Sequence, residues 1–132
     1  MDDVSTLFVR KFITLAKQTN LYLNHFPKSE KYALCQSIRD DMYRVFDLMV
    51  EGQKKYHKKT TLSELDITHE RLKAKLLLAY HLGYFSFKDG KTDGDNPLAI
   101  AEKRYANLSF LSDEIGRLIG GWIKKIKSEN RW

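Results

Sequence analysis

The chain has 132 residues, with 23 Lys and Arg against 17 Asp and Glu, a formal net charge of +6 and a pI of about 9.4. This length predicts a single domain over residues 1–132, and the basic balance favours an anionic partner such as a nucleic acid. No apolar run approaches the ~20 residues of a membrane span, so we expect no membrane partner. The only cysteine, Cys35, excludes an internal disulfide and fits a reducing compartment, which predicts a cytoplasmic protein.

The first half of the chain predicts two amphipathic helices. Apolar residues recur at the three- and four-residue spacing of one helix face over residues 4–23 and again over residues 28–57. Residues 24–27, which end in a proline, separate the two. Within the second helix, the apolar positions of residues 42–50 spread over roughly 220° at 100° per residue. A core-facing stripe needs only about 100°, so this helix has more apolar surface than one core can cover.

The second half predicts two further helices. Thr61 and Glu64 have the spacing of a capping box, which would start a third helix that runs to about Phe85. Asn96 as the cap and Pro97 at the first helical position predict a fourth helix that continues to about residue 127. Short loops between long amphipathic helices favour an all-α, antiparallel up-down-up-down four-helix bundle.

The third helix is also too apolar for a lone bundle. Residues 76–80 place apolar side chains around almost its whole circumference. Some of them are ordinary surface residues, or another copy of the chain covers them. Exposed patches of this size are usually interfaces, which favours self-association. The residues that we expect at an oligomer interface are Leu77, Leu78, Leu82 and Phe85.

Three glycines interrupt the apolar pattern of the fourth helix, at Gly116, Gly120 and Gly121. Each costs a helix roughly 1 kcal/mol relative to alanine, so each position needs a compensating reason. One reason is close packing inside the bundle, and the other is the close approach of a partner chain.

Residues for catalysis or metal binding do not occur in a recognisable pattern. A di-iron bundle needs two Glu-x-x-His pairs, and the nearest match is the single Asp66 to His69 spacing. The loop that begins at Asp89 fails as a calcium loop, because Lys91 and Ile100 occupy ligand positions. We therefore expect no enzymatic activity, no cofactor and no metal, and we expect Cys35 to be a small core residue.

Basic residues should gather at one end of the predicted bundle. The second and fourth helices run the same way, so their C-terminal ends meet, opposite an end that carries Asp89, Asp93 and Asp95. Helix-end lysines complement the macrodipole, but that explains only two or three of them. A surface that contacts phosphates explains more. There Tyr56 would either stack on an unpaired base or cover the core. The basic positions are Lys54, Lys55, Lys58, Lys59, Lys124, Lys125 and Lys127.

Three segments, within residues 10–126, resemble the accessory variability determinants of diversity-generating retroelements. The first is Phe26-Pro27-Lys28-Ser29-Glu30-Lys31-Tyr32-Ala33-Leu34, followed by Ile38-Arg39. The second comprises Leu65-Asp66, Leu72-Lys73 and Leu76 to Gly83. The third is Tyr105 and then Glu114-Ile115-Gly116-Arg117-Leu118-Ile119-Gly120-Gly121-Trp122-Ile123-Lys124. The first segment also occurs in the related ribosomal-RNA intervening-sequence bundle proteins. The Gly-Arg-x-x-Gly-Gly-Trp-x-Lys ending is much more specific.

The resemblance implies a bacterial or phage-encoded four-helix bundle that assembles as a barrel-shaped homopentamer and has no known enzymatic activity. It further implies binding to the retroelement's reverse transcriptase and template RNA, in support of error-prone cDNA synthesis. Arg117, Lys124 and Lys125 are the basic positions that the motif supplies, although Arg117 has Asp113 one turn earlier as a structural partner. The alternative is an intervening-sequence bundle protein with a scaffolding or unknown role.

Overall fold

The computed structural model describes residues 3–91 and 94–132, with side chains from Thr6 onwards. This part of the chain contains four α-helices, a short 3-10 helix and no strand, in agreement with the predicted fold class. The helices are α1 (Asp3–Leu23), η1 (Lys28–Glu30), α2 (Leu34–Lys54), α3 (Lys59–His81) and α4 (Pro97–Ser128). Among the described residues, no helix combines the length and the apolar character that crossing a membrane requires.

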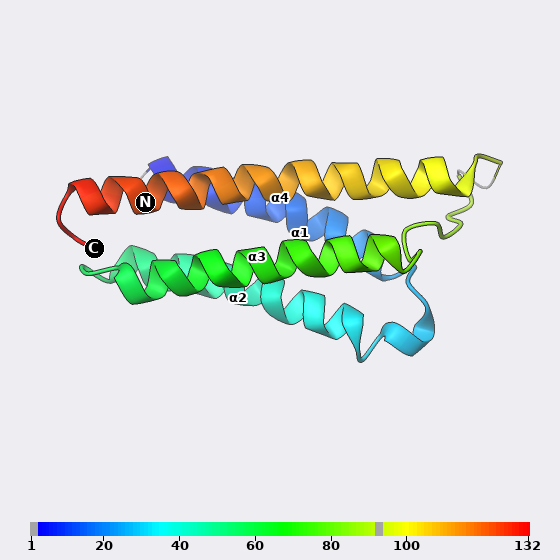
Figure 1. Ribbon diagram of the computed structural model, residues 1–132, viewed down its shortest axis with the longest axis horizontal. Helices are drawn as coiled ribbons and strands as arrows, with labels where there is room; N and C mark the ends of the chain where they lie inside the picture. Colours follow the sequence, from blue (N-terminus) through cyan, green and yellow to red (C-terminus); the bar gives the residue numbers. More distant parts are fainter. Residues whose placement is uncertain (1–2, 92–93) are drawn as a thin grey trace.

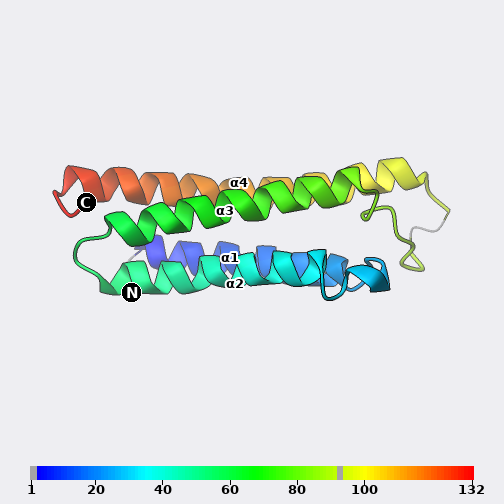
Figure 2. The same ribbon diagram turned by 60° about the horizontal axis from the view of Figure 1, so that its bottom comes forward.

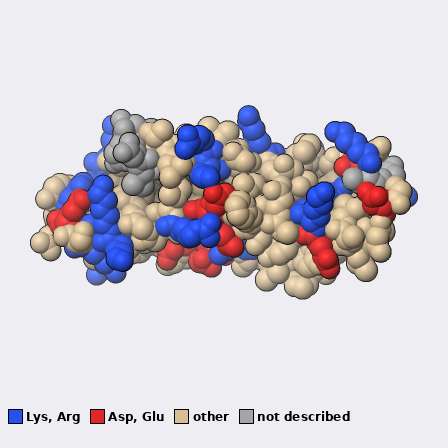
Figure 3. Space-filling model, turned by 90° about the horizontal axis from the view of Figure 1, so that it is seen from above, with Lys and Arg blue, Asp and Glu red and all other residues tan. Residues whose placement is uncertain are grey.

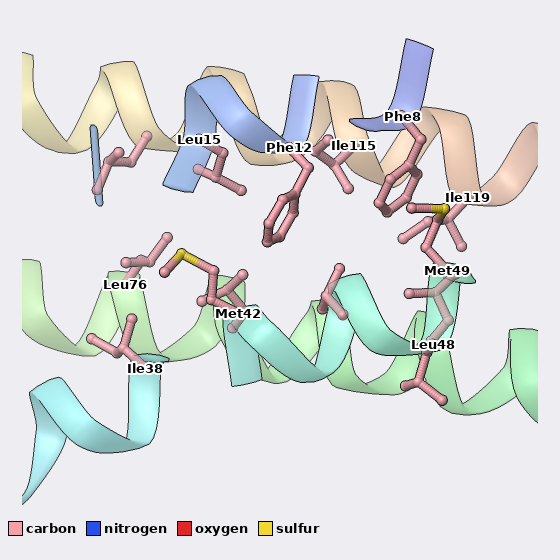
Figure 4. Close-up of a cluster of buried hydrophobic side chains, with 14 of the residues drawn as sticks. Phe8, Phe12, Leu15, Ile38, Met42, Leu48, Met49, Leu76, Ile115 and Ile119 are labelled. Atoms are coloured by element: carbon pink, nitrogen blue, oxygen red, sulfur yellow. The ribbon is translucent and has the colours of Figure 1, made fainter. Parts of the chain in front are cut away.

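The four α-helices alternate in direction and lie side by side along one long axis (Figures 1 and 2). Each packs against the helices that precede and follow it, and α1 closes the bundle against α4. Figure 4 shows that side chains from all four helices point toward one another between them. Phe8, Met42, Leu76 and Ile115 are each at most 1% exposed. Because α2 and α4 are parallel, their C-terminal ends lie at the same end of the bundle.

The predicted start of α4, with Asn96 as the cap and Pro97 in the first turn, is confirmed. The Asn96 side-chain oxygen accepts hydrogen bonds from the Leu98 and Ala99 backbone amides, at 2.9 and 3.5 Å. Pro97 occupies the first helical turn. Backbone N–H groups in this turn have no intrahelical acceptor, so the helix loses no hydrogen bond through proline's missing N–H.

The start and end of α2 differ from the prediction. The helix covers Leu34–Lys54 rather than residues 28–57. Residues 28–30 form a 3-10 helix instead, and Ala33 has ψ −103°, outside the helical region, which separates the two. Lys55 is extended, so α2 stops there.

The predicted capping box is wrong. The α3 helix begins at Lys59, so Thr61 already lies within its first turn, and the residue at the cap, Lys58, makes no side-chain cap bond. Thr61 is 3% exposed, and together with Lys55, which contributes most, it lowers the pKa of the Glu51 carboxyl of α2. The Thr61 side chain therefore interacts with α2 instead of capping α3.

The α3 helix also ends earlier than predicted, at His81. Gly83 has φ +80°, and the Tyr84 amide donates to the Ala79 carbonyl at 3.1 Å while the Gly83 amide donates to the Tyr80 carbonyl at 3.0 Å. These are the two hydrogen bonds of a Schellman motif, for which glycine is preferred. The turn leads the chain back toward the core at Phe85, which is 0% exposed.

Polar contacts join neighbouring helices across the bundle. Between α2 and α3, the buried Asp41 carboxylate accepts from Lys75 at 2.6 Å and from Arg71 at 3.3 Å. Between α3 and α4, His69 Nε2 lies 2.8 Å from the Ser112 carbonyl oxygen. Pairs of this kind select one register of the helices, because a shift of one turn would leave a buried polar group without its partner.

Candidate nucleic-acid interface

The predicted basic end exists, and three segments contribute to it. The C-terminal ends of α2 and α4 meet there with the start of α3 (Figure 1). Lys and Arg side chains gather at this end in the space-filling view, at the left of Figure 3. The predicted residues that are exposed here are Lys54, Lys55, Lys59, Lys124, Lys125 and Lys127. The arrangement therefore brings six of the seven predicted lysines to one accessible region.

Lys58 is the exception, and its predicted place on the surface is corrected. It is 3% exposed, and its ammonium donates to the Gly52 carbonyl at 2.5 Å and to the Lys55 carbonyl. These carbonyls lie at the C-terminal end of α2, where backbone carbonyls have no intrahelical N–H to accept from. Lys58 therefore satisfies the end of α2 from inside the bundle and is not part of the exposed basic surface.

The C-terminal tail covers part of this end. Asn130 has φ 56°, the Arg131 amide donates to the Ile126 carbonyl at 3.1 Å, and the Arg131 carbonyl accepts from the Lys58 amide at 3.0 Å. The tail thus ends α4 and joins it to the connection between α2 and α3. The Arg131 guanidinium lies 4.9 Å from the centre of the Tyr56 ring. Sequence reasoning did not assign Arg131 to the site, since the tail's return cannot be inferred from spacing.

Tyr56 does not cover the core, because it is 65% exposed. Arg131 lies over its ring, at a distance typical of a cation–π contact. Of the two roles that the sequence left open, this exposure favours stacking on an unpaired base, for which an aromatic face with a neighbouring cation is well suited.

The exposed lysines differ in how far carboxylates neutralise them. Lys55 forms a 2.7 Å ion pair with Glu51, and the hydrogen bond from Lys55 lowers the pKa of that carboxyl. Among the described residues, the other five exposed lysines at this end form no ion pair with a carboxylate: Lys54, Lys59, Lys124, Lys125 and Lys127. Unpaired lysines contribute most to a positive potential at a surface. All five are therefore candidates for contacts with phosphates, and Lys54, Lys59 and Lys124 represent the three helices that meet at this end.

Arg117 lies outside the basic end, two turns before Lys124 on the same face of α4. It is exposed, and Asp113 pairs with Lys73 of α3 at 3.1 Å rather than with Arg117. The structural role considered for Arg117 is therefore not observed. Gly120 and Gly121 lie between Arg117 and Lys124, and outside the backbone of α4 itself a Cβ at either glycine would meet no described atom within 4 Å. Close packing among the described residues does not explain these two glycines.

The opposite end carries Asp89 and Asp95, as predicted. Asp89 forms an ion pair with Arg104 at 3.3 Å, and Asp93 lies outside the described residues. Exposed basic residues are also present in η1, the α3–α4 loop and the start of α4, and blue side chains appear at both ends of Figure 3. Exposed positive charge is therefore present at both ends of the described structure, and the predicted charge polarity is weaker than expected.

Three of the four residues predicted at an oligomer interface are exposed on the surface. Leu77, Leu78 and Leu82 are 42, 48 and 49% exposed. Phe85 is wrong as a surface residue, because it is fully buried and packs edge-on against Tyr22. Leu78 and Leu82 are one turn apart and share a face, whereas Leu77 points about 100° away from Leu78.

A second apolar surface is a groove between α1 and α2. The sequence indicated it only indirectly. It has a volume of about 450 Å³ and its lining is mostly apolar. Ile13 and Tyr43 on its walls are 46 and 49% exposed. The excess apolar arc predicted for residues 42–50 was the signal for it. The residues that line the groove are Val9, Phe12, Ile13, Ala16, Lys17, Asn20, Tyr43 and Phe46.

Groups that could carry chemistry are few and separate. Within the described residues, no three His, Cys, Asp or Glu side chains lie close enough to hold a metal ion. Cys35 is 2% exposed and its thiol lies 3.7 Å from the Leu23 carbonyl oxygen. Burial raises the pKa of this thiol, which keeps it in the unreactive protonated form. Cys35 is thus a core residue, as predicted.

Comparison with protein families decides what this bundle is. A family model described as bAvd-like matches residues 6–126. The chain belongs to the bAvd-like family. The bAvd-like proteins are accessory proteins, associated with retroelement reverse transcriptases and not known as enzymes. Comparisons with curated proteins and with solved structures found no match. The resemblance drawn from three sequence segments is confirmed at the level of the bAvd-like family.

Proposed function

We propose that this protein is a non-enzymatic accessory factor of a diversity-generating retroelement. It binds the template RNA and the reverse transcriptase through the basic end and supports mutagenic cDNA synthesis. The observation that carries the proposal is the convergence of exposed lysines from α2, α3 and α4 at one end of the bundle. Membership of the bAvd-like family supports a reverse transcriptase as the partner, because the family is associated with these polymerases.

The physical argument for RNA is electrostatic. Lys54, Lys59 and Lys124 lie on three different segments and none pairs with a carboxylate in the described part of the chain. Separate points of positive charge suit a backbone of repeated phosphates, which they contact without reading sequence. Tyr56 adds an exposed ring for an unpaired base. The expected binding is therefore salt-dependent and nearly independent of sequence.

We further propose that the protein acts as a homo-oligomer, with a pentamer implied by the family resemblance. The exposed side chains of Leu77, Leu78 and Leu82 are the interface that we propose on α3. Gly120 and Gly121 support close contact with a partner, because no described residue of the same chain packs against the space beside them. A ring of copies would repeat the basic end, so that weak phosphate contacts add through multivalency.

RNA binding tests the proposal directly. A variant with Lys54, Lys59 and Lys124 all changed to Gln should bind single-stranded RNA more weakly than wild type. The slope of log affinity against log salt should fall by up to about 2, at roughly 0.7 per phosphate contact. The matched control changes Lys28, Lys31 and Lys103 to Gln, which removes the same charge from exposed sites at the other end. Equal slopes for the two variants would contradict a binding site at the basic end.

The reverse-transcriptase contact has its own test. The gene should lie beside a reverse-transcriptase gene and a template/variable repeat pair, and the two purified proteins should elute together. The Lys54, Lys59 and Lys124 variant should lose this association if the polymerase uses the same surface. A protein without either partner would fit the scaffolding alternative instead.

A further inference from the structure

A small cavity lies beneath the basic end, between the last turn of α2, the end of α4 and the C-terminal tail. Its volume is about 80 Å³, well above the ~10–15 Å³ that one water molecule requires. Gln53, Lys58, Lys125, Glu129 and Arg131 supply its polar lining, and Trp122 and Ile126 form its apolar wall.

Two of the residues that line this cavity each carry a buried donor without an acceptor among the described residues. Gln53 Nε2 and Arg131 Nε are buried atoms, and neither has a hydrogen-bond partner within the part of the chain that the structure describes. A buried donor left without a partner is destabilising, so such groups normally bind water or a ligand. Both atoms are N–H donors, and the group that satisfies them must therefore present acceptors.

The surrounding charge favours an anion as that group. Three cationic residues, Lys58, Lys125 and Arg131, line the cavity with one carboxylate, that of Glu129. Glu129 and Arg131 lie 3.5 Å apart as a loose, partly exposed pair, so the carboxylate can turn outward. The Lys58 ammonium also donates hydrogen bonds to the Gly52 and Lys55 carbonyls. Those oxygens would otherwise repel an anion at the C-terminal end of α2.

We propose that this cavity binds a phosphate oxyanion, as a defined subsite within the basic end. The inference rests on the proposed function, because there the phosphate belongs to the RNA strand that the exposed lysines attract. Arg131 connects the two features, since it is one of the residues that line the cavity and its guanidinium lies over the exposed Tyr56 ring. One phosphate in the cavity would place the adjoining nucleotide near that ring. The exposed lysines draw the strand in, and the cavity fixes its register.

NMR on the intact ¹⁵N-labelled protein tests the subsite. The probes are inorganic phosphate and a short single-stranded RNA, each against sodium chloride at equal ionic strength. The Gln53 side-chain amide and the Arg131 Nε–H resonances should shift saturably with both probes and not with chloride. Shifts with phosphate alone would assign the cavity to free phosphate, and they would overturn the RNA-strand proposal. No phosphate-dependent shift would show that water fills the cavity, and it would overturn the subsite altogether.

A matched pair of substitutions completes the test. Gln53→Leu removes one donor without changing the charge, and it should abolish the phosphate-dependent shift of Arg131 and weaken RNA binding roughly three- to tenfold. Gln36→Leu is the control, because Gln36 lies exposed at the other end of α2. If Gln53→Leu binds RNA as tightly as Gln36→Leu, the subsite is wrong. The salt slopes of the lysine variants still decide the proposed function, so the two failures are distinguishable.

Discussion

His69 is the buried residue whose chemistry most directly affects stability. It is 1% exposed, and its Nε2 donates to the Ser112 carbonyl, so Nδ1 carries no proton and has no partner among the described residues. Burial lowers the pKa of His69 below its ordinary value, and the bond to Ser112 offsets this only in part. The folded protein therefore keeps His69 neutral, as a helix-joining residue rather than a metal ligand.

This lowered pKa predicts a pH dependence of stability. Below about pH 6.5 the unfolded chain protonates His69 while the folded chain does not, so the free energy of unfolding falls as pH falls. The loss should approach 1.4 kcal/mol per pH unit between pH 6.5 and the lower folded-state pKa. Urea unfolding of wild type and His69→Gln at several pH values measures it. Gln can still donate to Ser112, so its curve should be flatter over this range, and parallel curves would contradict the assignment.

Gly52 shows that the glycine required by packing is not one of the three that the sequence singled out. A Cβ at Gly52 would lie 2.9 Å from Trp122 Cη2 and 3.1 Å from Leu62 Cδ2. The α2 backbone approaches α4 and α3 closely at this point, and a methyl group would force the Trp122 ring to move. At Gly116 the nearest side chain, His69, is at an ordinary 3.6 Å.

At the scale of secondary-structure elements, Lys58 and Lys59 have opposite predicted roles although they are neighbours. Lys58→Met removes the donor to the Gly52 and Lys55 carbonyls, so it should lower the free energy of unfolding by about 1–3 kcal/mol. The salt slope of RNA binding should not change. Lys59→Met should leave stability unchanged and reduce that slope, because Lys59 is exposed. Denaturation and RNA titrations of both variants check this, and a stable Lys58→Met protein would contradict it.

The elements that depend on local sequence were predictable, and those set by contacts between elements were not. Asn96 and Pro97 start α4 through bonds within three residues, so their sequence pattern was sufficient. The start of α3 depends on Lys58 reaching back to α2 and on Thr61 reaching Glu51, which no spacing rule contains. Phe85 was misplaced because the Gly83 turn, and not helical periodicity, sets its direction.

The sequence predicted part of the candidate site, namely its exposed lysines, but not Arg131 or the cavity beneath them. The alternation of four helices was sufficient to bring the ends of α2 and α4 together, and six lysines are exposed there as expected. Arg131 and the cavity beside Gln53 depend on the path of the C-terminal tail. That path has no periodic signal, so the sequence did not indicate it.

For the whole molecule, the unpaired apolar surface predicts self-association. Leu78→Glu together with Leu82→Glu should lower the mass measured by light scattering toward the 15.5 kDa of one chain. These residues share one exposed face of α3, and a charge there cannot be buried without a partner. Leu98→Glu is the matched control, because Leu98 is 74% exposed at the start of α4. A wild-type protein that is monomeric at micromolar concentration would contradict the interface.

The most direct test of the whole account is cDNA synthesis by the retroelement's reverse transcriptase on its template RNA, with and without this protein. Wild-type protein should raise the yield of cDNA. The variant with Lys54, Lys59 and Lys124 changed to Gln should lose that effect while keeping its fold and its mass. The variant with Lys28, Lys31 and Lys103 changed to Gln should retain it. Equal stimulation by both variants would contradict a role for the basic end, and no stimulation by wild type would contradict the accessory function itself.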